Sequence, residues 1–430
     1  MRRLLRAHVG VAIAAGTALL VIAAGTLGFI VTRPHGVALR PGPSPSTTVS
    51  AASPTPGETP QGSPTPSQAP QASPTARQTP RASPTVPTAA PTPACVNPAT
   101  WPIARRLAQL MIVGGQFSNP AASTPAASAG VGALVLFGQP AAGSGPAIQS
   151  GLAALSSAAT AAGQVAPWMC TDEEGGQVQR LAYVIGPLPS PRQMAAQWSP
   201  AQVQATLAAH AAAMRSLGIA MDLAPVVDTA SPTNPFADEK DRSFSDNGQV
   251  AAAYGLAFAN GLRSAGVVPV AKHFPGIGHA DADTDLGPAT DPPLSQLEVR
   301  DLVPFEVAVA GGVPAIMVSH AAVPGLTGQV PASLSAATYQ YLRDTVGFDG
   351  IAMTDSLGAG AVSAAGYSQP AAAAAALEAG ADMVMVDGSS WYATLIALEQ
   401  AVASGALPVS AVNASVREVL AAKGLRVCGS

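Results

Sequence analysis

Short apolar runs rich in β-branched residues alternate with helical stretches along the chain beyond Cys95. This alternation is typical of parallel βα units, in which a buried strand is followed by a helix that covers it. Eight units favour a closed α/β barrel of the (β/α)8 TIM type over an open doubly wound sheet. The runs with the character of buried strands are 109–115, 131–137, 167–172, 222–228, 267–273, 315–320, 350–355 and 382–387.

Helices are predicted between these runs, and a last one is predicted after the eighth. Residues 95–430 are therefore expected to form one barrel domain, which is long enough to bury a large core. The predicted helices include 200–217, 248–265, 295–311, 335–346, 369–380, 391–404 and 408–424.

The beginning of the chain has a different pattern. An apolar stretch from Val9 to Val31 follows the basic residues Arg2, Arg3 and Arg6. Its length of about 23 residues suits a helix that spans a bilayer core with its basic end in the cytoplasm. We expect residues 1–35 to be a transmembrane anchor, or a signal segment if the chain is cleaved there. The rest of the protein would then be extracytoplasmic, either anchored to the cytoplasmic membrane or secreted.

Residues 36–94 consist mainly of Pro, Ser, Thr, Ala and Gln. Such a composition cannot bury a core, so we predict a disordered Pro/Ser/Thr-rich linker with extended, polyproline-like character. A Ser-Pro-Thr triplet recurs along this stalk at Ser53, Ser63, Ser73 and Ser83.

Charge and ligand patterns exclude several kinds of partner. The formal net charge is −4, and the first 94 residues hold seven arginines and one glutamate, so the remainder is distinctly acidic. Nucleic acid is excluded as a partner because its phosphates require a basic surface. The sequence contains neither clustered His and Cys ligands nor a phosphate-binding glycine loop. We therefore expect no metal and no organic cofactor.

The three cysteines are Cys95, Cys170 and Cys428. Cys95 begins the predicted barrel and Cys428 nearly ends it, and the first and last elements of a barrel are neighbours. In an oxidising compartment a Cys95–Cys428 disulfide would join the two ends. Cys170 lies in a predicted strand and is expected to be a small buried residue.

Ionisable residues end six of the predicted strands, where a barrel of this type has its active site. Such residues cost desolvation energy unless they are paired or used in function. After the fifth strand, a loop rich in Gly, Asp and Pro runs to Pro293, long and polar as a mobile catalytic loop would be. The strand-ending residues are Asp172, Asp228, Lys272 with His273, His320, Asp355 and Asp387.

The string KHFPGIGHADADTD (272–285) resembles the Lys-His-Phe-Pro-Gly-His-Gly motif, followed by Asp-Ser-His, of the bacterial β-N-acetylhexosaminidases of glycoside hydrolase family 3. Further matches to the family occur in the expected order, so the resemblance extends over most of the predicted barrel. They are TDEEGGQVQRL (171–181), LAPVVD (223–228), DRSF (241–244), MTDSLG (353–358) and ALEAGADMVMV (376–386).

The resemblance implies a retaining exo-β-glycosidase that removes terminal β-N-acetylglucosamine, with Asp355 as the nucleophile of a covalent glycosyl-enzyme intermediate. A carboxylate at the mouth of a strand suits this role, although capping of the following helix is the alternative. The resemblance also implies sugar-binding roles for Asp172, Arg180, Arg242, Lys272 and His273. An internal salt bridge is the alternative for the two arginines.

Other ionisable residues near these motifs receive different interpretations. We interpret Asp228 as the buried partner of an arginine and leave it out of the site. Glu173 and Glu174 precede a Gly-Gly turn and are taken as structural. His320 either lines the pocket or is a histidine of the core.

The sequence departs from the family pattern at the proton donor. The family has a histidine at the end of the loop motif, whereas this chain has Asp283-Thr284-Asp285, and Ile277 replaces the histidine of Pro-Gly-His-Gly. An ordinary aspartate, with a pKa of about 4, is ionised at neutral pH. Asp283 and Asp285 could share a proton, His279 could supply an imidazole from earlier in the loop, or the donor is absent. We favour an active enzyme with Asp285 or Asp283 as the acid, and we expect His279 near the substrate.

The leading prediction is therefore a monomeric glycosidase that acts on carbohydrate fragments derived from the cell wall. One alternative is a catalytically impaired sugar-binding or wall-sensing protein with the same barrel. Another is a family 3 β-glucosidase.

Overall fold

The computed structural model describes residues 95–232 and 240–428. Eight parallel strands form a closed barrel in the order β1-β2-β3-β6-β7-β8-β9-β10, and β10 pairs with β1 to complete it. This confirms the predicted α/β barrel. The barrel strands are β1 (Met111–Gln116), β2 (Ala133–Phe137), β3 (Trp168–Thr171), β6 (Met221–Asp222), β7 (Val268–Phe274), β8 (Ala315–Val318), β9 (Ile351–Ser356) and β10 (Met383–Val386).

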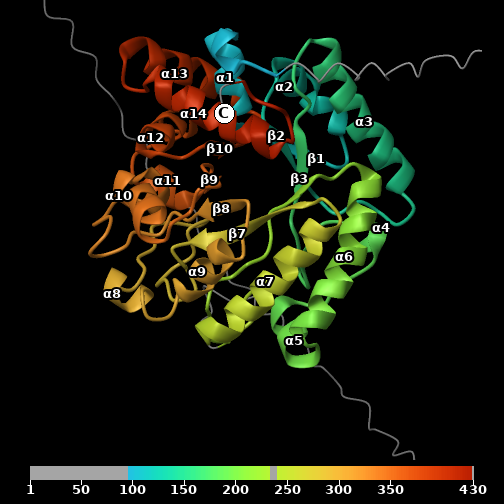
Figure 1. Ribbon diagram of the computed structural model, residues 1–430, viewed down its shortest axis with the longest axis vertical. Helices are drawn as coiled ribbons and strands as arrows, with labels where there is room; N and C mark the ends of the chain where they lie inside the picture. The colour runs from blue at the N-terminus through green and yellow to red at the C-terminus, as the bar shows by residue number, and fades with distance from the viewer. Residues whose placement is uncertain (1–94, 233–239, 429–430) are drawn as a thin grey trace, which may run out of the picture. The chain divides into compact units, whose positions relative to one another are not determined.

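Helices surround the barrel on the outside, as Figure 1 shows. Several begin with side-chain caps, among them the Ser-x-x-Gln capping boxes at Ser190 and Ser199 that start α5 and α6. The helices are α1 (Ile103–Gln109), α2 (Thr124–Ala129), α3 (Gly145–Ala161), α4 (Ala182–Ile185), α5 (Pro191–Gln197), α6 (Pro200–Leu217), α7 (Gly248–Ser264), α8 (Leu294–Leu297), α9 (Val303–Ala310), α10 (Ala336–Gln340), α11 (Gly360–Ala364), α12 (Gln369–Ala379), α13 (Trp391–Ser404) and α14 (Val409–Ala422).

Two expected elements are interrupted in the structure. The strand expected over 222–228 ends at Asp222, because Pro225 has no N–H to donate to a strand ladder; beyond it only Val226 forms a bridge, to Lys272. The helix expected over 295–311 is broken into α8 and α9. Between them lies Asp301, whose buried carboxylate accepts hydrogen bonds from residues of the loops at the carboxyl ends of the strands.

The helix expected over 335–346 is present in two forms, since α10 continues into a π-helical turn, Tyr341–Thr345. A short antiparallel hairpin that was not predicted follows β3. It consists of β4 (Glu173–Gly175) and β5 (Val178–Gln179), and it places the Glu174 and Arg180 region over the barrel mouth. Its turn depends on glycine, because Gly175 has a φ of 97° and a Cβ there would lie 2.3 Å from the Pro189 carbonyl oxygen.

The two ends of the barrel region are joined covalently. Cys95 and Cys428 form the disulfide expected from the sequence, with their Cα atoms 5.0 Å apart. Beside it Val96 and Val427 form a parallel bridge, and Figure 1 shows α1 next to α14. Cys170 is a buried free thiol.

Among the described residues, no helix combines the length and the hydrophobicity needed to cross a membrane. The anchor expected over 1–35 and the linker expected over 36–94 lie outside the residues that the structure describes.

Candidate functional site

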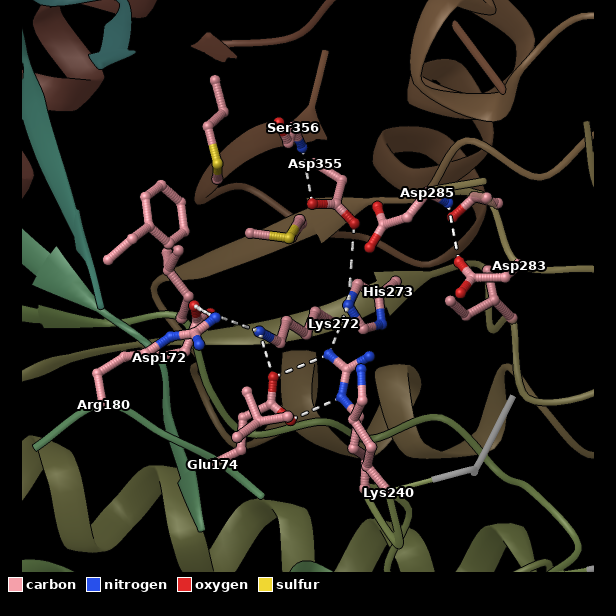
Figure 2. Close-up of a pocket in the computed structure, with 18 of the residues that line it drawn as sticks. Asp172, Glu174, Arg180, Lys240, Lys272, His273, Asp283, Asp285, Asp355 and Ser356 are labelled. Carbon is pink, nitrogen blue, oxygen red and sulfur yellow. Dashed lines mark hydrogen bonds and ion pairs between the residues drawn. The ribbon is translucent and has the colours of Figure 1, made fainter. Parts of the chain in front are cut away.

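A cavity of about 220 Å³ opens at the carboxyl ends of the barrel strands. We call it the central cavity, and Figure 2 shows most of the residues that line it. Eight of the nine residues that the sequence assigned to catalysis or sugar binding line it, and His279 does not. The lining residues are Phe137, Asp172, Glu174, Val178, Arg180, Leu223, Lys240, Arg242, Lys272, His273, Ile277, Ala282, Asp283, Thr284, Asp285, Met317, Asp355, Ser356 and Met385.

A lattice of ion pairs forms one side of the central cavity. Lys272 Nζ lies 2.7 Å from Glu174 Oε1 and 3.2 Å from Asp172 Oδ1. Arg180 Nη2 lies 3.3 Å from the other oxygen of Asp172. Arg242 binds both oxygens of Glu174, with Nε and Nη2 each at 2.8 Å. Each arginine therefore makes an internal salt bridge, which was the alternative interpretation, and each also lines the cavity.

The charges in this lattice stabilise one another. Burial alone would raise the pKa of Glu174, but the positive charges of Arg242 and Lys272 hold it well below its usual range. Burial alone would lower the pKa values of Arg242 and Lys272, yet Glu174 raises both. All three groups stay charged, so the cavity presents fixed donors and acceptors suited to sugar hydroxyls.

Asp228 fixes the ring of His273. Asp228 Oδ2 accepts a 2.6 Å hydrogen bond from Nδ1 of His273, and its two oxygens also accept from the backbone N–H groups of His273 and Ile277. The partner of this buried carboxylate is thus a histidine, and the expectation of an arginine was wrong. The bond orients Nε2 of His273 toward Arg242, at 3.5 Å, and toward Asp355.

Asp355 projects from the end of β9 into the centre of the cavity (Figure 2). Its Oδ1 accepts a 2.7 Å bond from the N–H of Ser356, and its Oδ2 lies 3.9 Å from Nε2 of His273. Burial alone would raise the pKa of Asp355, but its electrostatic interactions with His273, then His320 and Lys272, and the hydrogen bond from the N–H of Ser356 hold it below the usual value. The side chain is 23% exposed, so an ionised oxygen is accessible from the cavity.

Asp285 faces Asp355 from the loop that follows β7. Figure 2 shows their carboxylates turned toward one another, whereas Asp283 turns away and accepts a 2.9 Å bond from the backbone N–H of Asp285. Partial burial raises the pKa of Asp285, and the negative charges of Asp355 and Asp283 raise it further. The loop therefore brings one carboxyl that is disposed to hold a proton next to one that is disposed to stay ionised.

Backbone contacts hold this loop against the start of α11. The N–H of Gly360 donates to the carbonyl oxygen of Asp285, and the N–H of Ala361 donates to that of Thr284, at 2.9 and 3.0 Å. Glycine is required at 360 for this approach, because a Cβ there would lie 2.5 Å from the backbone of Leu286. The position of Asp285 is thus set by the turn that directly follows Asp355.

His279 does not lie where the sequence analysis expected it, near the substrate. It does not line the central cavity, and its Nδ1 lies 2.9 Å from Oδ1 of the buried Asp301. Asp301 also accepts hydrogen bonds from Thr229 and from Arg300. We assign His279 to the base of the loop and not to substrate contact, because Asp301 holds its ring there.

His320 is a satisfied core histidine. It is 1% exposed, and its two ring nitrogens lie 2.7 Å from Ser333 Oγ and 2.8 Å from the carbonyl oxygen of Ser356. The carbonyl can only accept, so Nε2 donates to it and Nδ1 accepts from the serine hydroxyl. Burial lowers the pKa of His320, which agrees with this neutral ring. His320 therefore stabilises the turn after Asp355 through its hydrogen bond to the carbonyl oxygen of Ser356.

Sequence reasoning missed Glu174 and Lys240 as residues of the cavity wall. Glu174 was taken as structural because it precedes a Gly-Gly turn, although an acidic residue just beyond a buried strand was a usable signal. Lys240 carried no comparable signal, since it lies in a loop. Among residues 95–232 and 240–428 the structure contains no group of three or more His, Cys, Asp or Glu side chains that could hold a metal ion.

Comparison with known proteins gives consistent matches. The sequence matches the model of the glycosyl hydrolase family 3 N terminal domain over residues 103–422. It is 38% identical over 351 residues to the beta-hexosaminidase LpqI of Mycobacterium tuberculosis (strain ATCC 25618 / H37Rv), covering 79% of this chain and 88% of that one.

Solved structures agree with these sequence matches. The structure of M. tuberculosis LpqI superposes with a TM-score of 0.70 at 37% identity, covering 77% of this chain and 98% of that chain. The beta-N-acetylhexosaminidase from Beutenbergia cavernae DSM 12333 also gives a TM-score of 0.70, at 30% identity over 76% of this chain and 100% of its own.

Proposed function

The chain belongs to glycosyl hydrolase family 3 and is a glycoside hydrolase, and from this premise we propose that it removes terminal β-linked N-acetylglucosamine with retention of configuration. The observation that carries the proposal is the pair of carboxyl groups at the mouth of the barrel. Asp355 is held ionised by positive neighbours, and Asp285 faces it with a raised pKa. Most retaining glycosidases use such a pair, with one ionised carboxylate as the nucleophile and one protonated carboxyl group as the acid.

The ion-pair lattice would hold the terminal sugar. Asp172, Arg180, Lys272 and Arg242 line one side of the central cavity and are already fixed by salt bridges to one another or to Glu174. Donors and acceptors that are fixed before the substrate arrives lose little side-chain entropy on binding. Nε2 of His273 faces the same space, held by the bond from its Nδ1 to Asp228. These groups would place the anomeric carbon above Asp355.

In the first step, an oxygen of Asp355 attacks the anomeric carbon and the bond from that carbon to the leaving oxygen breaks. Asp285 gives its proton to the leaving oxygen, and a glycosyl ester on Asp355 results. In the second step, the ionised Asp285 takes a proton from water, the water oxygen bonds to the anomeric carbon, and the ester bond to Asp355 breaks. Both carboxyl groups return to their starting states, and the sugar keeps its β configuration.

In this mechanism Asp285 is the proton donor, a role that a histidine has in the family motif that this chain resembles. An aspartate can hold the proton here because burial and two neighbouring carboxylates raise its pKa. Asp283 is the less suitable acid, because its carboxylate faces the backbone N–H of Asp285 and not Asp355.

We propose fragments of the cell wall that carry terminal N-acetylglucosamine as the substrate, and a site of action outside the cytoplasm. The names of the relatives support the sugar, since they include beta-hexosaminidase and beta-N-acetylhexosaminidase. The Cys95–Cys428 disulfide supports an oxidising compartment, and so does the apolar segment of residues 9–31 as an anchor or export signal. A monomer remains our prediction.

The proposal is tested with an aryl β-N-acetylglucosaminide that has a good leaving group, using the wild-type protein and Asp355→Ala. We expect the variant to lose at least about a thousandfold in kcat/KM, because the nucleophile is removed. Equal rates in the two proteins would overturn the assignment of Asp355 as the nucleophile. The matching aryl β-glucoside serves as the specificity control, and faster turnover of the glucoside would assign the chain to β-glucosidase activity.

A further inference from the structure

A second cavity, of about 380 Å³, lies next to the central one, at the carboxyl ends of β10, β1 and β2. We call it the side cavity. Its volume is within the range of small-molecule sites, and it opens on the face of the barrel where such folds bind ligands. Its polar and aromatic lining includes Gln116, Ser118, Asn119, Ser123, Asp387 and Trp391.

The side cavity adjoins the central cavity at Phe137. Phe137, at the end of β2, lines both cavities, and the guanidinium of Arg180 lies 5.8 Å from the centre of its ring. Asp387 lines the side cavity, and its Oδ2 lies so close to Gly358 that a Cβ on this glycine would be 3.1 Å away. Gly358 belongs to the turn that follows Asp355.

That turn connects the side cavity with the proposed acid. Gly358 contacts Asp387 of the side cavity, and Gly360 donates its N–H to the carbonyl oxygen of Asp285. The turn therefore adjoins both the side cavity and the proposed acid. A leaving group that extends from a glycosidic bond at Asp355 and Asp285 toward β10 and β1 would reach the side cavity.

The lining of the side cavity suits a sugar ring. Trp391 is partly exposed and brings its indole ring to the cavity, while Ser118, Asn119 and Ser123 offer hydroxyl and amide groups that make no side-chain hydrogen bond among the described residues. An apolar ring face beside neutral donors and acceptors matches a pyranose, which has an apolar C–H face and a rim of hydroxyls. No lysine or arginine lines the cavity, and the carboxylate of Asp387 accepts from Gln369.

We infer that the side cavity binds the leaving-group sugar, so that the substrate is an oligosaccharide whose terminal residue occupies the central cavity and whose second residue packs on Trp391. This inference rests on the proposed function, because it assigns the leaving group of that reaction. The second sugar is recognised through its hydroxyl and amide groups and one ring face. A carboxylate on that sugar would have to face solvent, since the cavity has no cation for it.

The kinetic test compares two substrates: N,N′-diacetylchitobiose, whose leaving group is a sugar, and an aryl β-N-acetylglucosaminide, whose leaving group is not. Trp391→Ala is expected to lower the ratio of kcat/KM for the disaccharide to that for the aryl substrate by about tenfold, from the loss of the aromatic contact. Asn119→Ala changes an exposed side chain and is expected to lower the ratio in the same direction. Ile396→Ala, on the same helix as Trp391 but outside the cavity, is the matched control. An unchanged ratio in both cavity variants would overturn the inference.

A binding measurement separates this inference from the proposed function. Calorimetric titration of Asp355→Asn, which removes the nucleophile's charge but keeps its shape, compares N,N′-diacetylchitobiose with N-acetylglucosamine. The disaccharide is expected to bind about tenfold more tightly, and Trp391→Ala in the same background is expected to abolish this gain. Equal affinities for the two sugars would refute the side cavity as a subsite even if the enzyme is active. A gain that depends on Trp391, in a protein that does not cleave the aryl substrate, would keep the subsite and refute the proposed function.

Discussion

The carboxylates of Asp355 and Asp285 face each other at the mouth of the barrel although the two residues come from different βα units (Figure 2). Asp355 ends β9, and Asp285 belongs to the loop after β7, which reaches across to the start of α11. This arrangement favours a protonated Asp285 and an ionised Asp355. The negative charge of Asp355 contributes to the raised pKa of Asp285, while positive neighbours keep Asp355 ionised.

Replacing the proposed acid is expected to affect substrates according to their leaving groups. Asp285→Asn should lower kcat/KM by about 10²–10⁴-fold for a disaccharide, whose leaving oxygen needs a proton. A dinitrophenyl glycoside needs no protonation, so the first step with this substrate should be nearly unaffected. Steady-state and burst kinetics on the two substrates make the comparison. An equal loss on both substrates would show that Asp285 is not the acid.

The pH profile should reflect the two pKa shifts. Asp355 must be ionised, and its pKa is lowered, so activity should persist on the acidic side of the usual range of an aspartate. Asp285 must be protonated, and its pKa is raised, so activity should fall as the pH rises through that raised value. Asp283→Asn keeps an oxygen that can accept from the N–H of Asp285 but removes a negative charge. It should move the alkaline limb of kcat/KM to lower pH, and a limb that stays in place or moves upward would contradict this account.

The contact of His279 with Asp301 should matter for positioning the acid. His279→Ala removes the 2.9 Å bond that joins the loop to the buried Asp301. Loosening the loop should lower kcat for the disaccharide by up to about a hundredfold, with a much smaller loss for the dinitrophenyl glycoside. His279→Asn, which can still donate to Asp301, should recover part of the loss. If both variants match the wild type on the disaccharide, the loop does not depend on this contact.

Much of the fold was readable from the sequence because buried parallel strands leave continuous apolar runs. β2 and β10, for example, lie within the predicted runs and are almost entirely buried. The break between α8 and α9 has a signal in the sequence, because Pro304 lies in the first turn of α9 and could not continue a longer helix. The burial of Asp301 between these helices has no such signal, because its partners His279 and Thr229 lie in other parts of the chain.

The site was predicted where residues lie in the last positions of strands, as with Lys272, His273 and Asp355. The loop residues were harder to assign. Asp283 and Asp285 are chemically identical in the sequence, and only the bonds to Gly360 and Ala361 determine which of them faces Asp355. His279 was misplaced for the same reason, because its partner Asp301 cannot be identified by spacing along the chain.

The central claim is that Asp355 becomes covalently glycosylated, and Asp285→Asn provides the most direct measurement. With a dinitrophenyl β-N-acetylglucosaminide the first step needs no acid, whereas the second step lacks its base, so the intermediate should accumulate. Rapid acid quenching, digestion and mass spectrometry should find one N-acetylhexosaminyl residue on the peptide that contains Asp355. A burst of dinitrophenol without this adduct, or with the sugar on a different residue, would contradict the account.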